Sequence, residues 1–159
     1  MKVNIMVNGK SYRKEIEPRM LLVSFIRDEL ELTGTHIGCD TTDCGACSVL
    51  MDGKAVKSCT VLAVQADGHQ IETIENGDDR ELNLIKESFI EENGLQCGFC
   101  TPGMIMTALY LLRGNNNPDE DYIKSNLSGN LCRCTGYVSI INSIKNARDK
   151  LNEQQVVSK

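Results

Sequence analysis

The stretch Gly38-Cys39-Asp40-Thr41-Thr42-Asp43-Cys44-Gly45-Ala46-Cys47 decides how this chain is interpreted. It places three cysteines in the order Cys-x4-Cys-x2-Cys, with Gly38 before the first and Gly45 between the last two. Glycine lets a loop wrap closely around a compact group, through positive φ or amides aimed inward. A fourth cysteine, Cys59, follows the turn Asp52-Gly53. One loop and one further element can therefore bring four thiolates together.

The spacing of this first set is typical of plant-type [2Fe–2S] ferredoxins. Zinc is the rival, because it also binds four thiolates, but structural zinc sites usually pair two short Cys-x2–4-Cys knuckles. Only Cys44-x2-Cys47 has that form here. We therefore predict a [2Fe–2S] cluster on Cys39, Cys44, Cys47 and Cys59.

A second set of four cysteines lies in the other half of the chain. Cys97-x2-Cys100 precedes the helix start Thr101-Pro102, and Cys132-x-Cys134 precedes a helix beginning near Val138. A helix N-terminus offers free N–H groups and partial positive charge, which suit an anionic thiolate cluster. Cys-x-Cys is not a usual zinc spacing, so the residues favour iron–sulfur over zinc at this set too, without excluding zinc.

The composition restricts the function classes. The 159 residues carry a net charge of −5, only 4% aromatic residues and no Trp, which argues against a nucleic-acid-binding protein. We see no signal peptide at the N-terminus and no apolar run long enough to span a membrane. Eight cysteines without an export signal favour metal or redox chemistry over disulfides. The sequence thus predicts a cytoplasmic redox protein.

The periodicity changes midway along the chain. The first part predicts strands over 3–7, 12–16, 47–51, 55–59 and 69–74, with hairpin turns at Asn8-Gly9 and Asp52-Gly53 and one helix after Pro18. The second part predicts helices over 82–90, 101–114 with Thr101 as N-cap, 119–127 and 138–151, then a frayed tail over 152–159. A polar stretch over 75–80 separates them. We predict two domains, 1–76 and 77–159, each carrying four cysteines.

Three runs resemble a known family: Thr33–Cys47, Gly94–Gly103 and Gly129–Tyr137. They are similar to the two cluster loops of the xanthine oxidase, or molybdenum hydroxylase, family. The similarity covers the chain from about Lys2 to Leu151. It resembles the separate small iron–sulfur subunit of carbon monoxide dehydrogenase and related aldehyde oxidoreductases.

The resemblance implies an α+β fold, with a β-grasp [2Fe–2S] ferredoxin-like domain followed by a four-helix-bundle [2Fe–2S] domain. It implies a large molybdopterin subunit and a medium FAD subunit as partners, in a hetero-oligomer such as a dimer of heterotrimers. Electrons would pass from the molybdopterin centre through the second cluster, then the first, to FAD. Gln96 matches a position that contacts the pterin, and Cys134 matches the ligand nearest to it.

Several other residues have two interpretations. Arg133 could offset the cluster charge or pair with a partner carboxylate, or it could be an ordinary surface arginine. His36 could act as a ligand as in Rieske centres, but four cysteines already complete the first site. Lys54, Lys57 and Arg80 are interpreted as solvated charges, any of which could also contact a partner. We find no catalytic nucleophile, paired carboxylates or phosphate loop in this chain.

Three functions compete: an electron-transfer subunit of a molybdenum hydroxylase, a free-standing ferredoxin, and a zinc-binding interaction module. The second cysteine set favours the subunit, since a diffusing carrier needs no helical bundle with another cluster. The family analogy favours an aldehyde such as glyceraldehyde as substrate of the complex, with carbon monoxide second.

Overall fold

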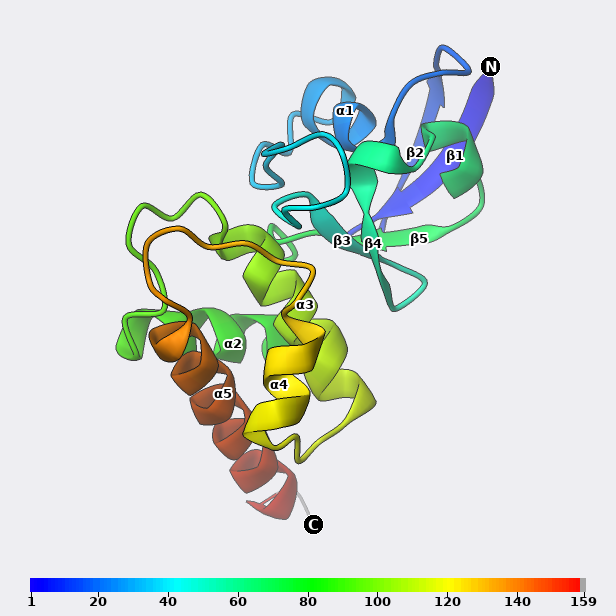
Figure 1. The fold of residues 1–159 in the computed structure, drawn as a ribbon. Helices are drawn as coiled ribbons and strands as arrows, with labels where there is room; N and C mark the ends of the chain where they lie inside the picture. The colour runs from blue at the N-terminus through cyan, green and yellow to red at the C-terminus, as the bar shows by residue number, and fades with distance from the viewer. Residues whose placement is uncertain (158–159) are drawn as a thin grey trace.

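The structure is a computed structural model that describes residues 1–157, and the side chains of residues up to 154. Its N-terminal part is a five-stranded mixed sheet in the order β2-β1-β5-β3-β4 (Figure 1). The strands are β1 (Lys2–Val7), β2 (Lys10–Glu15), β3 (Ser48–Met51), β4 (Lys54–Lys57) and β5 (Gln70–Glu72). β1 and β5 are parallel, and the other neighbours are antiparallel.

Both predicted hairpin turns are confirmed. Asn8 and Gly9 have φ of 49° and 76°, and Asp52 and Gly53 have φ of 48° and 75°. Positive φ at both central residues matches the right-handed twist of the strands on either side. The turn at Asp52 brings β4 back along β3, which delivers Cys59 to the loop containing the other three cysteines.

Helical segments cover one face of this sheet. α1 (Leu22–Ser24) continues into a π-helical turn, η1 (Phe25–Glu29), which replaces the single regular helix predicted after Pro18. Two 3-10 segments follow β4, η2 (Ser58–Thr60) and η3 (Ala63–Ala66), so Cys59 lies on a 3-10 turn rather than on the predicted strand. The core on this face is formed by residues that include Ile5, Leu22, Phe25, Ile26, Val49 and Ile71.

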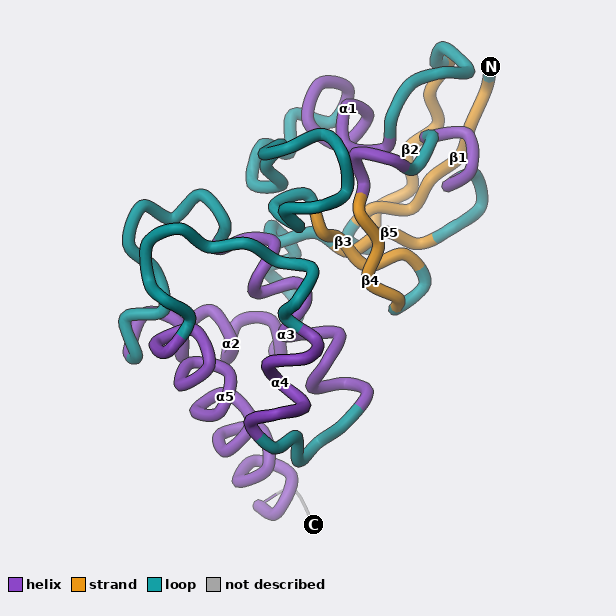
Figure 2. Tube along the Cα trace, viewed as in Figure 1, coloured by secondary structure: helices purple, strands orange, loops and turns teal. Residues whose placement is uncertain are grey.

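The C-terminal part is helical, as expected. Its helices are α2 (Arg80–Glu91), α3 (Thr101–Gly114), α4 (Glu120–Asn126) and α5 (Val138–Val157) (Figure 2). The fold is therefore the predicted α+β combination of a β-grasp sheet and a helical bundle. No helix in the part of the chain that the structure describes is long and apolar enough to cross a membrane.

The two parts share a packed boundary. Val49 belongs to the core under α1, whereas its neighbour Leu50 belongs to the core of the helical part. Successive side chains of a strand point to opposite faces, so β3 supplies both cores. α3 packs against the second face of the sheet through β3 and β4.

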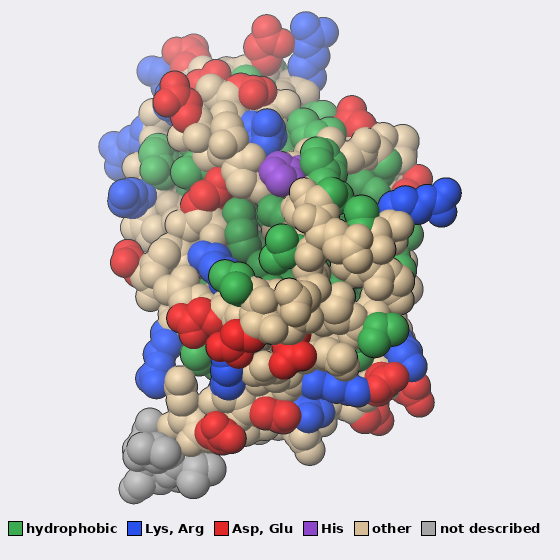
Figure 3. Space-filling view, turned by 90° about the vertical axis from the view of Figure 1, so that its left-hand side faces the viewer, with side chains coloured by type: hydrophobic (Ala, Val, Ile, Leu, Met, Phe, Trp, Pro, Cys, Tyr) green, Lys and Arg blue, Asp and Glu red, His purple; other side chains and the backbone are tan. Residues whose placement is uncertain are grey.

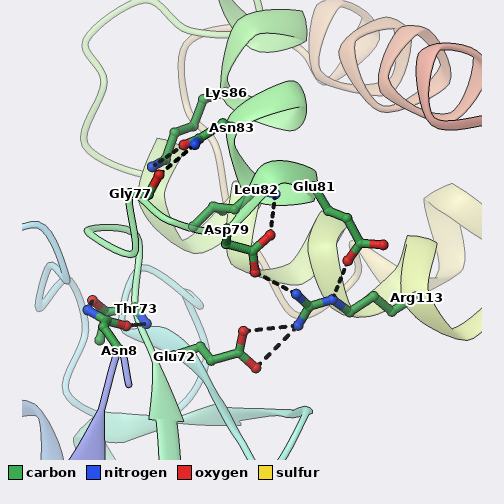
Figure 4. A network of polar contacts seen from close by, with 10 residues as sticks. All are labelled: Asn8, Glu72, Thr73, Gly77, Asp79, Glu81, Leu82, Asn83, Lys86 and Arg113. Atoms are coloured by element: carbon green, nitrogen blue, oxygen red, sulfur yellow. Dashed lines mark hydrogen bonds and ion pairs between the residues drawn. The ribbon is translucent and has the colours of Figure 1, made fainter. Parts of the chain in front are cut away.

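Arg113 ties the same boundary together at the other end of α3 (Figure 4). Its guanidinium contacts Glu72 of β5 at 3.0 Å, Asp79 at 2.5 Å and Glu81 at 2.7 Å. Asp79 also caps α2, because its side chain accepts a hydrogen bond from the backbone N–H of Leu82 at 3.0 Å. One arginine thus joins the last strand to the start of α2 and the end of α3.

Two expectations about helix ends were wrong. Thr101 is the first residue of α3 and Cys100 occupies the N-cap position, so Thr101 does not cap the helix. α5 extends to Val157, so the tail predicted to fray from Asn152 is helical as far as the structure describes it. Residues 158–159 of that predicted tail lie outside the described residues.

Candidate metal centres

The loop 38–47 and the 3-10 turn η2 bring the first cysteine set together at the end of the sheet facing the helices. Cys47 and Cys59 are 2% and 3% exposed, whereas Cys39 and Cys44 are partly exposed. The loop needs its glycines. A Cβ on Gly38 would lie 2.7 Å from the Cys44 sulfur, and Gly45 has a φ of 70°. A larger residue at Gly38 would occupy space beside the thiolates.

Hydrogen bonds prepare one sulfur of this set for a metal. The backbone N–H groups of Thr41 and Cys44 each donate to Cys39 Sγ at 3.3 Å. Hydrogen bonds from the Thr41 side chain and from these amides lower the pKa of Cys39 to about 6. Cys47 differs, because burial raises its pKa to about 11. A metal that binds Cys47 must therefore displace a firmly held proton.

The second set forms where the loop before α3 meets the loop before α5. Cys134 Sγ and Cys97 Sγ lie 3.5 Å apart, and both residues are exposed. Cys100 and Cys132 lie further inside and are partly buried. The two loops run along the same side of the molecule (Figure 1). The helix starts at Thr101 and Val138 lie close behind these thiols, as the sequence predicted.

The four thiols of the second set have different environments. Burial raises the pKa of Cys100 to about 12, and the neighbouring Cys132 adds to this shift. Although burial opposes it, hydrogen bonds from Thr135 lower the pKa of Cys132. A backbone hydrogen bond from Phe99 lowers the pKa of Cys97. Hydrogen-bond donors thus favour the thiolates of Cys132 and Cys97, whereas the hydrogen bond with Cys97 raises the pKa of Cys134.

Both sets fit a binuclear cluster. In the second set Cys97 Sγ and Cys134 Sγ lie 3.5 Å apart, and electrostatic interactions also link Cys39 with Cys44, Cys47 with Cys59, and Cys100 with Cys132. Two such pairs could supply two thiolates to each iron of a binuclear cluster. Among the described residues, no three His, Cys, Asp or Glu side chains come close enough to hold a single metal ion.

A buried hydroxyl beside the second set supports the same fit. Thr101 Oγ1 is buried without a hydrogen-bond partner, which holds for no other buried side-chain nitrogen or oxygen among the described residues. Thr101 directly follows Cys100. A cluster sulfur is an acceptor for such a donor, and buried hydroxyls are normally satisfied.

Hydrogen bonds join the two sites. The backbone N–H of Leu131 donates to the carbonyl of Cys44 at 2.8 Å, and the side chain of Asn130 donates to the carbonyl of Gly45 at 3.2 Å. The start of α3 lies against the same loop, since a Cβ on Gly103 would lie 2.1 Å from the Gly45 carbonyl oxygen. The segment that leads to Cys132 is therefore fixed to the loop that carries Cys44.

The remaining predicted residues lie at the exposed edge of the second set. Gln96 and Arg133 are exposed, and no ion pair among the described residues involves Arg133. His36 stacks on Phe99 with ring centroids 4.8 Å apart, and its Nδ1 lies 2.8 Å from the Phe99 carbonyl. His36 therefore connects the two cysteine loops.

The sequence analysis did not identify two residues that connect the two cysteine sites, Lys57 and Asn130. Lys57, interpreted as a solvated charge, is partly buried, and its Nζ donates to the carbonyl of Gly129 at 2.6 Å. Asn130 is 3% exposed and accepts a hydrogen bond from the Thr107 hydroxyl at 3.1 Å. Each contact joins residues far apart in the chain, so local pattern carries no signal of it. The one signal in the sequence was that Lys57 precedes Cys59 by two residues.

Comparisons with known proteins agree with this geometry. A family model described as "[2Fe-2S] binding domain" matches residues 70–145, which include the second cysteine set. The caffeine dehydrogenase subunit gamma of Pseudomonas sp. (strain CBB1) is 48% identical over 147 residues, covering 90% of this chain and 88% of that protein. The nicotine 6-hydroxylase small subunit of Paenarthrobacter nicotinovorans is 40% identical, covering 97% of this chain and 93% of that protein.

Solved structures give the same assignment. A chain of quinoline 2-oxidoreductase from Pseudomonas putida 86 superimposes with a TM-score of 0.90 and 43% identity, covering 96% of both chains. Aldehyde oxidoreductase from Desulfovibrio gigas also gives 0.90, with 34% identity, but there the match spans 97% of this chain and 17% of that one. This chain belongs to the small, electron-transferring iron–sulfur subunits of the molybdenum hydroxylase, or xanthine oxidase, family.

Proposed function

We propose that this subunit holds two [2Fe–2S] clusters, one on Cys39, Cys44, Cys47 and Cys59 and one on Cys97, Cys100, Cys132 and Cys134. The observation that carries the proposal is the gathering of thiols at each site, where Cys97 Sγ and Cys134 Sγ lie 3.5 Å apart and two backbone amides donate to Cys39 Sγ. When bound, the clusters supply one-electron carriers between a molybdopterin centre and FAD in partner subunits. The chain itself contributes the thiolates, the donors around them and the spacing between the two sites.

The exposed edge of the second set supports contact with a molybdopterin subunit. Cys97 and Cys134 are exposed there beside Gln96 and Arg133, whereas the inner thiols of the first set are covered. Large apolar side chains are also exposed along the same loops: Ile37, Leu95, Phe99, Leu131 and Val138. Figure 3 shows hydrophobic side chains gathered in the middle of this face, between charged groups above and below. An apolar surface around exposed thiols suits burial by a partner.

The assembly that we propose is the one expected for the family. The chain would join a large molybdopterin subunit and a medium FAD subunit in a hetero-oligomer, such as a dimer of heterotrimers, in the cytoplasm. We place the domain boundary between residues 76 and 77, in the polar stretch before α2. The sheet core supports this division because all its buried members precede residue 76, and the helical core is formed by residues after 80 apart from Leu50 of β3.

The substrate of the complex is a separate question, because this chain binds none. The sequence motifs favour an aldehyde such as glyceraldehyde. Relatives named for nitrogen heterocycles, caffeine and nicotine, are 48% and 40% identical, whereas an aldehyde oxidoreductase iron–sulfur subunit from Escherichia coli is 35% identical. These identities favour a nitrogen heterocycle as the second candidate. Activity of the assembled complex on glyceraldehyde and on purine or pyridine substrates would separate the two.

The cluster assignment is tested by iron and acid-labile sulfide content with low-temperature EPR of the dithionite-reduced chain. We expect about four irons per chain and two distinct signals. Cys47→Ser should remove one signal and Cys134→Ser the other, while Thr60→Ala, beside Cys59, should keep both. Zinc without an EPR signal, or both signals surviving either cysteine substitution, would contradict the proposal.

A further inference from the structure

Lys57 is a charged side chain in an unusual position. It is the last residue of β4 and lies two residues before Cys59, at the boundary with the helical part. Its Nζ donates to the Gly129 carbonyl at 2.6 Å and approaches Ser48 Oγ at 3.4 Å. No ion pair among the described residues includes Lys57. A partly buried ammonium without a carboxylate is costly unless another anion offsets it.

Lys57 lies beside the cysteines of the first set. Its Nζ approaches Ser48, the residue after Cys47, and a Cβ on Gly45, the residue after Cys44, would lie 2.6 Å from it. Cys59 follows Lys57 by two residues, so a cluster bound at this set is the anion next to the ammonium. Four thiolates, two sulfides and two ferric ions carry a net charge of about −2, and reduction makes it about −3. The cation therefore interacts more strongly with the reduced cluster than with the oxidised one.

The same side chain is connected to the second site. Gly129, its acceptor, precedes Asn130 and Leu131, which hydrogen-bond to the carbonyls of Gly45 and Cys44 at 3.2 Å and 2.8 Å. This segment runs directly into Cys132. Space here is tight, because a Cβ on Gly45 would lie 2.6 Å from Lys57 Nζ and 2.4 Å from the Gly129 carbonyl oxygen. The ammonium is thus held between the first cysteine loop and the segment leading to the second.

We propose that Lys57 is a positioning residue for electron transfer, whose fixed positive charge favours the reduced state of the first cluster and whose hydrogen bond to Gly129 holds the second-cluster segment against it. This inference rests on the proposed assignment of the cysteines. One electron from the second cluster reduces the first, and no bond is made or broken at the lysine. A cation beside the receiving cluster directs electrons away from the second site.

The test compares Lys57→Gln with Lys57→Arg in the cluster-loaded full chain. Glutamine keeps a hydrogen-bond donor and removes the charge, whereas arginine keeps both. Lys54→Gln is the matched control, because Lys54 lies on the same strand and is exposed. The readout is an EPR-monitored redox titration, which follows the two clusters separately in one sample.

We expect Lys57→Gln to reduce the ratio of reduced to oxidised first cluster by about tenfold at a given potential, which is a shift of about 59 mV for a one-electron couple. The second cluster should shift much less, Lys57→Arg should restore the wild-type value, and Lys54→Gln should leave both clusters unchanged. If Lys57→Gln does not retain the first cluster, Lys57→Arg must retain it at the wild-type potential.

Three results would overturn the inference. They are an unchanged first-cluster potential in Lys57→Gln, equal shifts in the glutamine and arginine variants, and loss of the first cluster in both. A wild-type chain without two cluster signals would instead refute the cysteine assignment itself, so the two failures are distinguishable.

Discussion

Replacing Arg113 by methionine removes the guanidinium that joins β5, α2 and α3 and keeps most of the apolar stem. The side chains of Glu72 and Asp79 are only 13% and 10% exposed, so two nearly buried carboxylates would lose their counter-charge. Breaking a buried pair from one side costs about 3–5 kcal/mol. Because the arginine side chain is 31% exposed, water compensates part of this. We expect Arg113→Met to lower the free energy of unfolding by about 2–4 kcal/mol.

The assay is urea denaturation of the cluster-loaded chain, followed by far-UV circular dichroism. With an m value of about 2 kcal/mol/M, the loss corresponds to a midpoint lowered by about 1–2 M. Glu81→Gln is the matched control, since the Glu81 side chain is 45% exposed and its contact with Arg113 is worth about 0–1 kcal/mol. Adding Glu72→Gln to Arg113→Met should recover part of the loss, because one unpaired carboxylate is then gone. A midpoint within about 0.3 M of wild type for Arg113→Met would refute the reasoning.

Three further predictions concern other contacts. Gly103→Ala should lower the free energy of unfolding by about 1–3 kcal/mol and change the spectrum of the first cluster, because its Cβ would meet the Gly45 carbonyl. The control is Gly114→Ala on the same helix, which should not lower the thermal midpoint because the space around Gly114 is open. Glu120→Gln should lower the urea midpoint at pH 7. Lys124 and Lys145 hold the pKa of Glu120 at about 2, below its usual 4.5, so the difference from wild type should be full above pH 4.5 and shrink as pH falls toward 2. Tyr137→Phe removes the hydroxyl that accepts a hydrogen bond from the Cys132 backbone N–H at 3.0 Å, which should lower the free energy of unfolding by about 1 kcal/mol. On heating, the second cluster should therefore be lost before the first. Simultaneous loss of both clusters would contradict this.

The sequence by itself determined the secondary structure classes, the two hairpin turns and the two cysteine sets. These are local features: Asn8-Gly9 and Asp52-Gly53 specify their turns through positive φ, and the cysteine spacings lie within short loops. The N-cap of α3 was predicted wrongly, because a threonine before a proline fits both the N-cap and the first helical turn. Local chemistry could not choose between them.

Only the tertiary structure decided how the two halves meet. The pairing of Lys57 with Gly129, of Leu131 with Cys44 and of Arg113 with Glu72 joins residues 41–87 positions apart. No periodicity records such contacts, because they depend on the packing of α3 against the sheet. For the same reason Lys57 looked like a solvated charge in the sequence. Its burial comes from the neighbouring segment, Gly129–Leu131, and a side chain's environment is set by what packs over it rather than by its own identity.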